Sequence, residues 1–268
     1  MIKIINDIEL NVNREGEGTP FVWGHGLLGN MEVEDKANWF HWARMSECVN
    51  LIRYDARGHG LSQITYSPQD YVWENLAHDM VAVANSVEVD KFIAGGQSMG
   101  SATAIFAGMA EQNRIEALIL ITPPTAWEQR AEQSSLYSRM ALIARLLGGK
   151  GLGILIARNP ERLLPAWLVK TMGTDTGLVG NVIGRMSGKN LATVLRGAAL
   201  CDLPPRSSLK KLNMPTLILA WEGDKSHPVE TAEVLHQLIP NSEYHLAKDI
   251  YDFRTWPLIM REFVQKIS

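Results

Sequence analysis

Five consecutive residues, GQSMG at positions 96–100, have the types and spacing that a nucleophilic serine needs. An apolar segment precedes them, and a run of small residues typical of a helix start follows them. In a strand–turn–helix of this kind, small residues on either side of the serine allow a strained turn that exposes its hydroxyl group. We therefore interpret Ser98 as a nucleophile, with a glycine-rich tight turn that carries no chemistry as the alternative.

A nucleophilic serine also needs a proton acceptor and an acid that orients the acceptor. Asp224 follows an apolar segment late in the chain, and Glu222 is a second candidate acid. His227, three residues after Asp224, and His245 are the candidate bases, of which we prefer His227. An acid and a base only three residues apart are awkward to align, so we expect Asp224 to orient His227 only loosely.

Short apolar segments alternate with longer helix-like segments, a pattern typical of a mostly parallel sheet that is covered by helices. Ligands bind outside the carboxyl ends of the strands in such sheets, and both Ser98 and Asp224 follow an expected strand. The expected strands lie at 21–23, 51–54, 91–94, 117–121 and 216–220. The expected helices lie at 71–87, 99–112, 229–238 and 254–266, with Pro257 near the start of the last one.

The strand signal disappears between about residues 127 and 205, where apolar helical stretches and glycine-rich segments alternate. We predict a helical cap at 126–205 that is inserted into a sheet domain formed by 1–125 and 206–268. The glycines at 148–153 indicate a helix break rather than a phosphate loop, because they follow no strand. The candidates to line an apolar substrate pocket are Trp127, Tyr137, Met140, Trp167, Met172 and Met186.

Several segments together resemble the α/β-hydrolase fold family. GHGLLG at 24–29 resembles the family's oxyanion loop, and YDARGHGLS at 54–62 resembles its D-x-R-G-x-G-x-S segment. WEGD at 221–224 is similar to the loop that supplies the acid. The resemblance implies a mostly parallel central sheet flanked by helices, with an inserted helical cap. It also implies an oxyanion hole formed by the backbone amides of Leu27 and Met99.

The segment after the last apolar strand departs from the family pattern. Members of the family carry a histidine there, whereas this chain has no histidine from residue 246 onward. The base is therefore His227, His245 or no conventional base at all. His25 and His59 match family positions that are usually structural, which leaves both outside the candidate bases.

The serine motif and the resemblance predict a serine hydrolase that cleaves small apolar carboxylic esters or lactones through an acyl-enzyme on Ser98. A catalytically impaired protein of the same fold that binds a small molecule is the alternative. Carbon–carbon bond hydrolysis is a lesser alternative. Dehalogenation is disfavoured because a serine rather than an aspartate occupies the turn.

Composition restricts the partners and the compartment. The 268 residues carry 26 Lys and Arg against 29 Asp and Glu, without a basic block, so we expect no nucleic-acid partner. Cys48 and Cys201 lie far apart, and we expect neither a metal nor a cofactor. The N-terminal segment lacks a signal-peptide pattern, and no stretch of about 18 uninterrupted apolar residues occurs. We therefore expect a cytoplasmic protein with a small-molecule substrate and no membrane partner.

Overall fold

The computed structural model describes residues 1–162, 164–172 and 177–267. In this part of the chain eight strands form one sheet in the order β1-β2-β4-β3-β5-β6-β7-β8. The first two neighbouring pairs along the sheet are antiparallel and the remaining pairs are parallel, which confirms the predicted, mostly parallel sheet. Beyond the five strands expected, the sheet has two N-terminal strands at one edge and β8 at the other. The strands are β1 (Ile2–Ile5), β2 (Ile8–Glu15), β3 (Pro20–Gly24), β4 (Asn50–Tyr54), β5 (Phe92–Gln97), β6 (Ile115–Ile121), β7 (Thr216–Trp221) and β8 (Ser242–Ala247).

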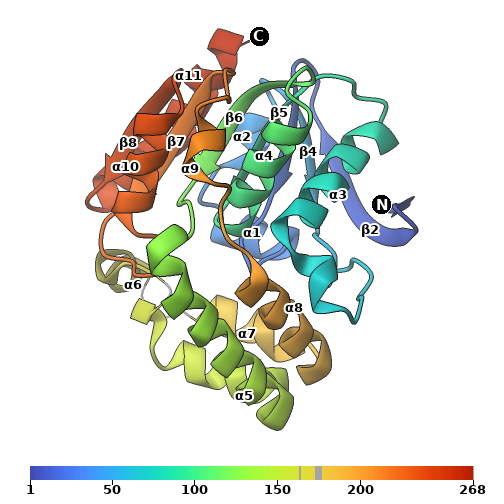
Figure 1. Cartoon of the computed structure of the whole chain (residues 1–268), viewed down its shortest axis with the longest axis vertical. Coiled ribbons are helices and arrows are strands. Elements are labelled where there is room, and N and C mark those ends of the chain that lie inside the picture. Colours follow the sequence, from blue (N-terminus) through green and yellow to red (C-terminus); the bar gives the residue numbers. More distant parts are fainter. Residues whose placement is uncertain (163, 173–176, 268) are drawn as a thin grey trace.

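Helices cover both faces of the sheet (Figure 1). One face carries α3 (Trp73–Ser86), α4 (Met99–Ala110), α9 (Arg206–Leu209) and α10 (Val229–Leu238), and the other carries α2 (Trp42–Met45) and α11 (Ile250–Ile267). Successive side chains of a strand point to opposite faces, so Val22 joins the first apolar core whereas Phe21 and Trp23 join the second. This alternation buries the strands on both sides, as a parallel sheet requires.

A further group of helices lies beyond the sheet (Figure 1). It consists of α5 (Arg130–Ala157), α6 (Ala166–Met172), α7 (Gly177–Arg185) and α8 (Gly188–Leu200), and we refer to it as the helical layer. α5 contacts α7 and α8, and a separate apolar cluster that includes Met140, Leu152, Ile183 and Leu191 holds these three helices together. The backbone of Gly148 (φ 69°, ψ 179°) interrupts α5, which agrees with the break predicted in this glycine-rich segment.

The last helix starts earlier than the sequence suggested. α11 begins at residue 250 because the Asp249 carboxylate caps it, accepting hydrogen bonds from the N–H groups of Tyr251 (2.8 Å) and Asp252 (3.0 Å). Pro257 therefore lies inside the helix, and the expectation that it would be near the start is wrong. The Pro257 ring is buried, and this packing offsets the loss of one backbone hydrogen bond.

Candidate active site

Ser98 is the single residue between β5 and α4, and its backbone has a positive φ (φ 54°, ψ −109°). A non-glycine residue in such a conformation is strained, and strain of this kind clusters at functional sites. The flanking glycines permit the turn. A Cβ atom on Gly100 would lie 1.9 Å from the Gly24 carbonyl oxygen, and one on Gly96 would lie 2.3 Å from the Gly100 carbonyl carbon. Only glycine fits at these two positions, and the turn leaves Ser98 on the wall of a cavity.

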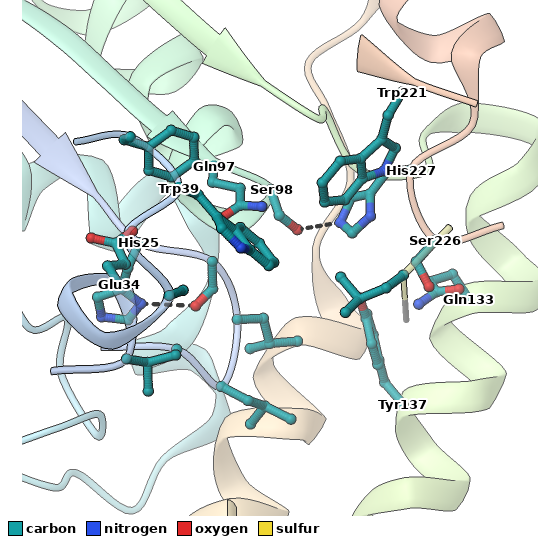
Figure 2. Close-up of a pocket in the computed structure, with 18 of the residues that line it drawn as sticks. His25, Glu34, Trp39, Gln97, Ser98, Gln133, Tyr137, Trp221, Ser226 and His227 are labelled. Atoms are coloured by element: carbon teal, nitrogen blue, oxygen red, sulfur yellow. Dashed lines mark hydrogen bonds between the residues drawn. The ribbon is translucent and has the colours of Figure 1, made fainter. Parts of the chain in front are cut away.

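Ser98, His227 and Asp224 form one hydrogen-bonded chain, of which Figure 2 shows the first link. The Ser98 hydroxyl oxygen lies 2.7 Å from His227 Nε2, and His227 Nδ1 lies 2.5 Å from Asp224 Oδ2. The Asp224 side chain is fully buried, and that of His227 is 15% exposed. When Nδ1 carries a proton and its N–H donates a hydrogen bond to the carboxylate, Nε2 is free to accept the serine proton.

The short loop between β7 and α10 supplies both His227 and Asp224. It passes through Gly223, whose φ of 89° favours glycine, and the His227 N–H donates back to the Asp224 carbonyl oxygen (3.3 Å). The Thr125 N–H donates to the Ser226 carbonyl oxygen (3.1 Å) and ties the loop to the segment after β6. The expectation that Asp224 would orient His227 only loosely is wrong, because this turn brings the two side chains into direct contact.

Asp224 is held in its ionised form. Burial alone raises the pKa of its carboxyl group, but the neighbouring His227 and three hydrogen bonds outweigh that effect and hold the pKa below its ordinary value. The donors are His227 Nδ1, the Ser226 N–H (2.7 Å to Oδ1) and Trp221 Nε1 (3.1 Å to Oδ2). A fixed, ionised carboxylate is the group that keeps an imidazole in one tautomer and one orientation.

The other candidate acid and base lie outside this hydrogen-bonded chain. Glu222 has an exposed side chain, and its backbone carbonyl accepts a hydrogen bond from Trp167 Nε1 (3.1 Å). His245 is exposed on β8, the edge strand, where it pairs in register with Leu219 of β7. The loop after β8, where the resemblance led us to expect a histidine, instead provides Asp249 as the cap of α11.

Leu27 and Met99 belong to two segments that meet at Ser98. Leu27 lines the same cavity as Ser98, and a Cβ atom on the adjacent Gly26 would lie 3.7 Å from the Ser98 Cβ. Met99 is the first residue of α4, so the hydrogen bonds of the helix leave its N–H group without a partner inside the helix. Both amides therefore come from backbone next to the serine hydroxyl.

His25 and His59 fasten the loop that carries Leu27. The Ala56 N–H donates to His25 Nε2 (3.0 Å), and the Leu28 N–H donates to His59 Nε2 (3.3 Å). Burial lowers the pKa of both imidazoles, that of His59 to about 3, so both rings are neutral near pH 7 and act as acceptors. Their partners are backbone groups, which agrees with the structural roles that the resemblance implied.

A cavity of about 170 Å³ opens beside Ser98 and His227. Figure 2 shows that its residues come from two sides, the segment around α1 (Met31–Ala37) and the helix α5. Apolar side chains on these two sides are Val33, Trp39 and Phe40, and Leu136, Tyr137 and Met140. A mostly apolar wall with a few polar groups is typical of a site for a small apolar molecule. Within the described residues, no three His, Cys, Asp or Glu side chains are grouped to hold a metal ion.

The structure brings two of the six predicted pocket residues, Tyr137 and Met140, to this cavity. It does not bring Trp127 there. The Trp127 indole N–H donates to the Pro204 carbonyl oxygen (3.0 Å), and the Arg206 guanidinium lies 4.3 Å from the centre of a Trp127 ring. These contacts fasten Trp127 to the segment that returns to the sheet, and it is not among the residues that line the cavity.

The remaining pocket candidates also lie elsewhere. The centre of the Trp167 ring is 6.5 Å from that of Trp221, on the side of α11. The Trp167 indole N–H donates a hydrogen bond to the Glu222 carbonyl oxygen. Met186 lines a second cavity between the helical layer and the segment that follows β4. The side chain of Met172 lies outside the residues that the structure describes.

The cavity wall formed by α1 and the residues that follow it was not predicted from the sequence. A helix-start signal was present, because Asn30 precedes a segment with acidic residues in its first turn. The Asn30 side chain accepts a hydrogen bond from the Val33 N–H (2.9 Å) and caps the helix. Trp39 and Phe40 carried no signal of their own, since their approach to Ser98 depends on how distant segments fold together.

Glu34 is a buried carboxyl group at the edge of this cavity. Its Oε1 accepts a hydrogen bond from Trp23 Nε1 (2.8 Å), whereas Oε2 lies 4.0 Å from Arg53 Nη1 and makes no hydrogen bond within the described structure. Burial raises the pKa of Glu34 to about 8, so the group is protonated near neutral pH. Its neutral form keeps the cavity free of an uncompensated negative charge.

Comparison with known proteins agrees with this architecture. Residues 21–251 match the model of the Alpha/beta hydrolase family. The chain is similar to 3-oxoadipate enol-lactonase 1 of Acinetobacter baylyi, with 22% identity over 214 residues, which cover 76% of this chain and 72% of the relative.

Solved structures show the same fold at low sequence identity. The enol-lactonase from Burkholderia xenovorans LB400 superposes with a TM-score of 0.84 and 19% identity, over 99% of this chain and 100% of the other. A thermophilic esterase from Thermogutta terrifontis superposes with a TM-score of 0.81 and 21% identity, over 100% of this chain and 98% of the other.

Proposed function

The chain belongs to the alpha/beta hydrolase family, and from this premise we propose that it hydrolyses small apolar carboxylic esters or lactones through an acyl-enzyme on Ser98. One observation carries the proposal. The Ser98 hydroxyl, the His227 imidazole and the Asp224 carboxylate are linked by contacts of 2.7 and 2.5 Å at the wall of an apolar cavity. A serine hydroxyl is a weak nucleophile without such a base.

In the first half-reaction Ser98 Oγ attacks the carbonyl carbon of the ester while its proton passes to His227 Nε2. The carbonyl oxygen gains the negative charge, and the N–H groups of Leu27 and Met99 stabilise it. The bond to the leaving oxygen then breaks, and His227 returns the proton to that oxygen. The alcohol leaves from an ester, whereas in a lactone it remains attached to the acyl group.

In the second half-reaction water attacks the carbonyl carbon of the acyl-enzyme. His227 takes one proton from the water and returns it to Ser98 Oγ as the acyl–oxygen bond breaks. Asp224 stays ionised throughout and stabilises the imidazolium that forms twice in each cycle. The depressed pKa of Asp224 supports this role.

The cavity and the relatives support the proposed substrate class. Its apolar walls favour a small apolar acyl group, and its volume of about 170 Å³ limits the size of that group. The similar proteins include an enol-lactonase and an esterase by their printed names, so both open-chain and cyclic esters belong to the proposal.

We also propose that the helical layer is a cap, inserted at 126–205 between the two parts of a core formed by 1–125 and 206–268. The apolar cluster that joins α5, α7 and α8 supports this division, and Leu28 and Tyr71 of the core pack against it. Tyr137 and Met140 of α5 line the cavity opposite Val33, so the cap contributes to substrate choice. A change in how the cap sits on the core alters the size of the acyl group that fits.

The alternative of a catalytically impaired binding protein rested on the missing histidine after β8. The hydrogen bond between His227 and Ser98 favours the hydrolase instead. A panel of p-nitrophenyl esters of increasing acyl length and of aliphatic lactones tests the proposal. We expect turnover of short apolar substrates by the wild-type protein and none by a folded Ser98→Ala variant. Tight binding of these compounds without turnover would favour the alternative.

A further inference from the structure

α5 consists of two helical segments that meet at the break at Gly148, and we refer to the exposed side chains of residues 139–158 on both segments as its outer face. Large apolar side chains are exposed on both segments. Single exposed apolar residues are normal on a protein surface, but several close together in the chain mark an interaction site. Leu142 is 56% exposed, Leu146 is 72% exposed and Ile154 is 55% exposed. The large apolar side chains exposed along this helix are Leu142, Leu146, Leu147, Ile154 and Leu155.

The same face carries positive charge without negative charge. Residues 134–159 contain four basic side chains and no Asp or Glu, in a chain that has 29 acidic against 26 basic residues. Arg139, Arg145, Lys150 and Arg158 are all exposed. Among the described residues no carboxylate forms a salt bridge with any of the four. The charge of the outer face is therefore uncompensated within the molecule.

The inner face of α5 accounts for the rest of its apolar residues. Met140, Ala144 and Leu152 are buried against α7 and α8, and Leu136 and Tyr137 point to the cavity. The exposed leucines are therefore not needed for the core of the helical layer. Figure 1 shows α5 at the edge of the molecule, away from the sheet.

We propose that the outer face of α5, residues 139–158, binds the surface of an anionic lipid bilayer. Exposed leucine and isoleucine side chains on a helix insert at the boundary between headgroups and acyl chains, and flanking Lys and Arg side chains attract anionic headgroups. The proposal concerns this face alone and holds whether or not Ser98 is a nucleophile. It differs from the expectation from the sequence that the protein has no membrane partner.

The geometry favours binding on the surface over crossing the bilayer. By length and composition the stretch Trp127–Ala157 could span a membrane. However, it is interrupted at Gly148, and its inner face packs on α7 and α8, which a lipid-embedded helix would have to abandon. A second copy of the chain fits the face less well, because a symmetric contact would set four cations against the same four cations.

Co-sedimentation with lipid vesicles tests the proposal on the full-length protein. One set of vesicles contains phosphatidylcholine alone, and the other contains phosphatidylcholine mixed with phosphatidylglycerol. We expect the protein to sediment with the anionic set and to remain largely in solution with the neutral set. Added salt should weaken the binding, because it screens the attraction between the cations and the headgroups.

Two variants with matched controls assign the binding to this face. Arg145→Glu with Lys150→Glu should lower the affinity for anionic vesicles by at least about tenfold, since each cation near such a surface contributes separately. Lys210→Glu with Lys211→Glu makes the same change of charge on exposed residues next to α9 and should bind as the wild type does. Circular dichroism melting curves check that both variants are folded.

A second pair of variants tests the contribution of the exposed apolar side chains to vesicle binding. Leu146→Ser should weaken vesicle binding several-fold, whereas Leu258→Ser, at a position on α11 that is 59% exposed, should not. The proposal is overturned if the wild-type protein ignores anionic vesicles, or if the α5 variants and their controls bind equally. It is also overturned if the protein dimerises without lipid and Leu146→Ser abolishes the dimer, because the face would then join two copies.

Discussion

His227 Nε2 lies 2.7 Å from Ser98 Oγ, although the two residues are 129 positions apart in the chain. His227 comes from the loop between β7 and α10, the same loop that carries Asp224. The resemblance to the family led us to expect the base after β8 instead. The base and the acid of this site therefore come from one short loop, and their alignment depends on a single turn.

Replacing His227 separates the two candidate bases. His227→Ala should lower kcat for a good ester substrate by about 10²–10⁴-fold, the usual contribution of a general base. His245→Ala is the matched control, because His245 is exposed on the edge strand β8. Steady-state kinetics should leave the control within error of the wild type. Equal losses in the two variants would contradict the assignment.

Replacing the acid tests the tautomer of His227. In Asp224→Asn the amide nitrogen can donate to Nδ1, which favours the imidazole tautomer with its proton on Nε2, where it cannot accept from serine. We expect a loss of roughly 10³-fold in kcat, with little change in substrate binding. A variant that retains wild-type kcat would show that Asp224 does not orient the base.

The same variant has an effect on stability in acid. The pKa of Asp224 in the folded protein is below its ordinary value, so its stabilisation is present above about pH 4 and is lost as the pH falls through the folded-state pKa. Urea unfolding should therefore give a difference in unfolding free energy between wild type and Asp224→Asn that shrinks toward low pH. A difference that does not depend on pH would contradict the depressed pKa.

The glycine after the serine turn should be intolerant of a side chain. In Gly100→Ala the new Cβ would lie 1.9 Å from the Gly24 carbonyl oxygen. Neither atom can move aside without a shift of the backbone. We expect a loss of stability of about 1–3 kcal/mol or more. Gly184→Ala, within α7, is the matched control. Its new Cβ would meet only the Lys150 Cα, at 3.9 Å. Thermal melts should show a lower midpoint than wild type for Gly100→Ala. The midpoint of the control should not fall, because alanine in a helix is more stable than glycine by up to about 1 kcal/mol.

Glu34 should make the protein less stable as the pH rises. Its pKa is about 8 in the folded state and near its ordinary value in the unfolded chain, so the folded state binds more protons between these two values. Stability therefore falls from about pH 5 to pH 8 through this group. Glu34→Gln removes this titration. The unfolding free energy of the variant minus that of the wild type should therefore increase from about pH 5 to pH 8. A constant difference would mean that Glu34 is ionised in the folded protein.

The sequence predicted best those features that depend on neighbouring residues. The strand before Ser98, the glycines around it and the helix after it lie within about twenty positions, so the turn was recognisable. Alternating apolar segments likewise predicted the parallel strands, because burial on both faces leaves a continuous apolar run.

Features that depend on distant contacts were not predictable. Trp39 and Gln133 reach the cavity only because α1 and α5 fold over the strand ends, and nothing local marks them. The tight alignment of Asp224 with His227 depends on a backbone turn at Gly223, which spacing alone does not specify. Trp127 had the composition expected of a pocket residue, but its contacts with Pro204 and Arg206 hold it elsewhere.

Intact mass spectrometry after incubation with a fluorophosphonate probe tests whether His227 activates Ser98. The probe reports an activated serine without requiring the natural substrate. We predict a single adduct on the wild type, none on Ser98→Ala, and a much slower reaction for His227→Ala than for His245→Ala. The absence of an adduct on folded wild-type protein, or equal labelling of Ser98→Ala, would contradict the claim.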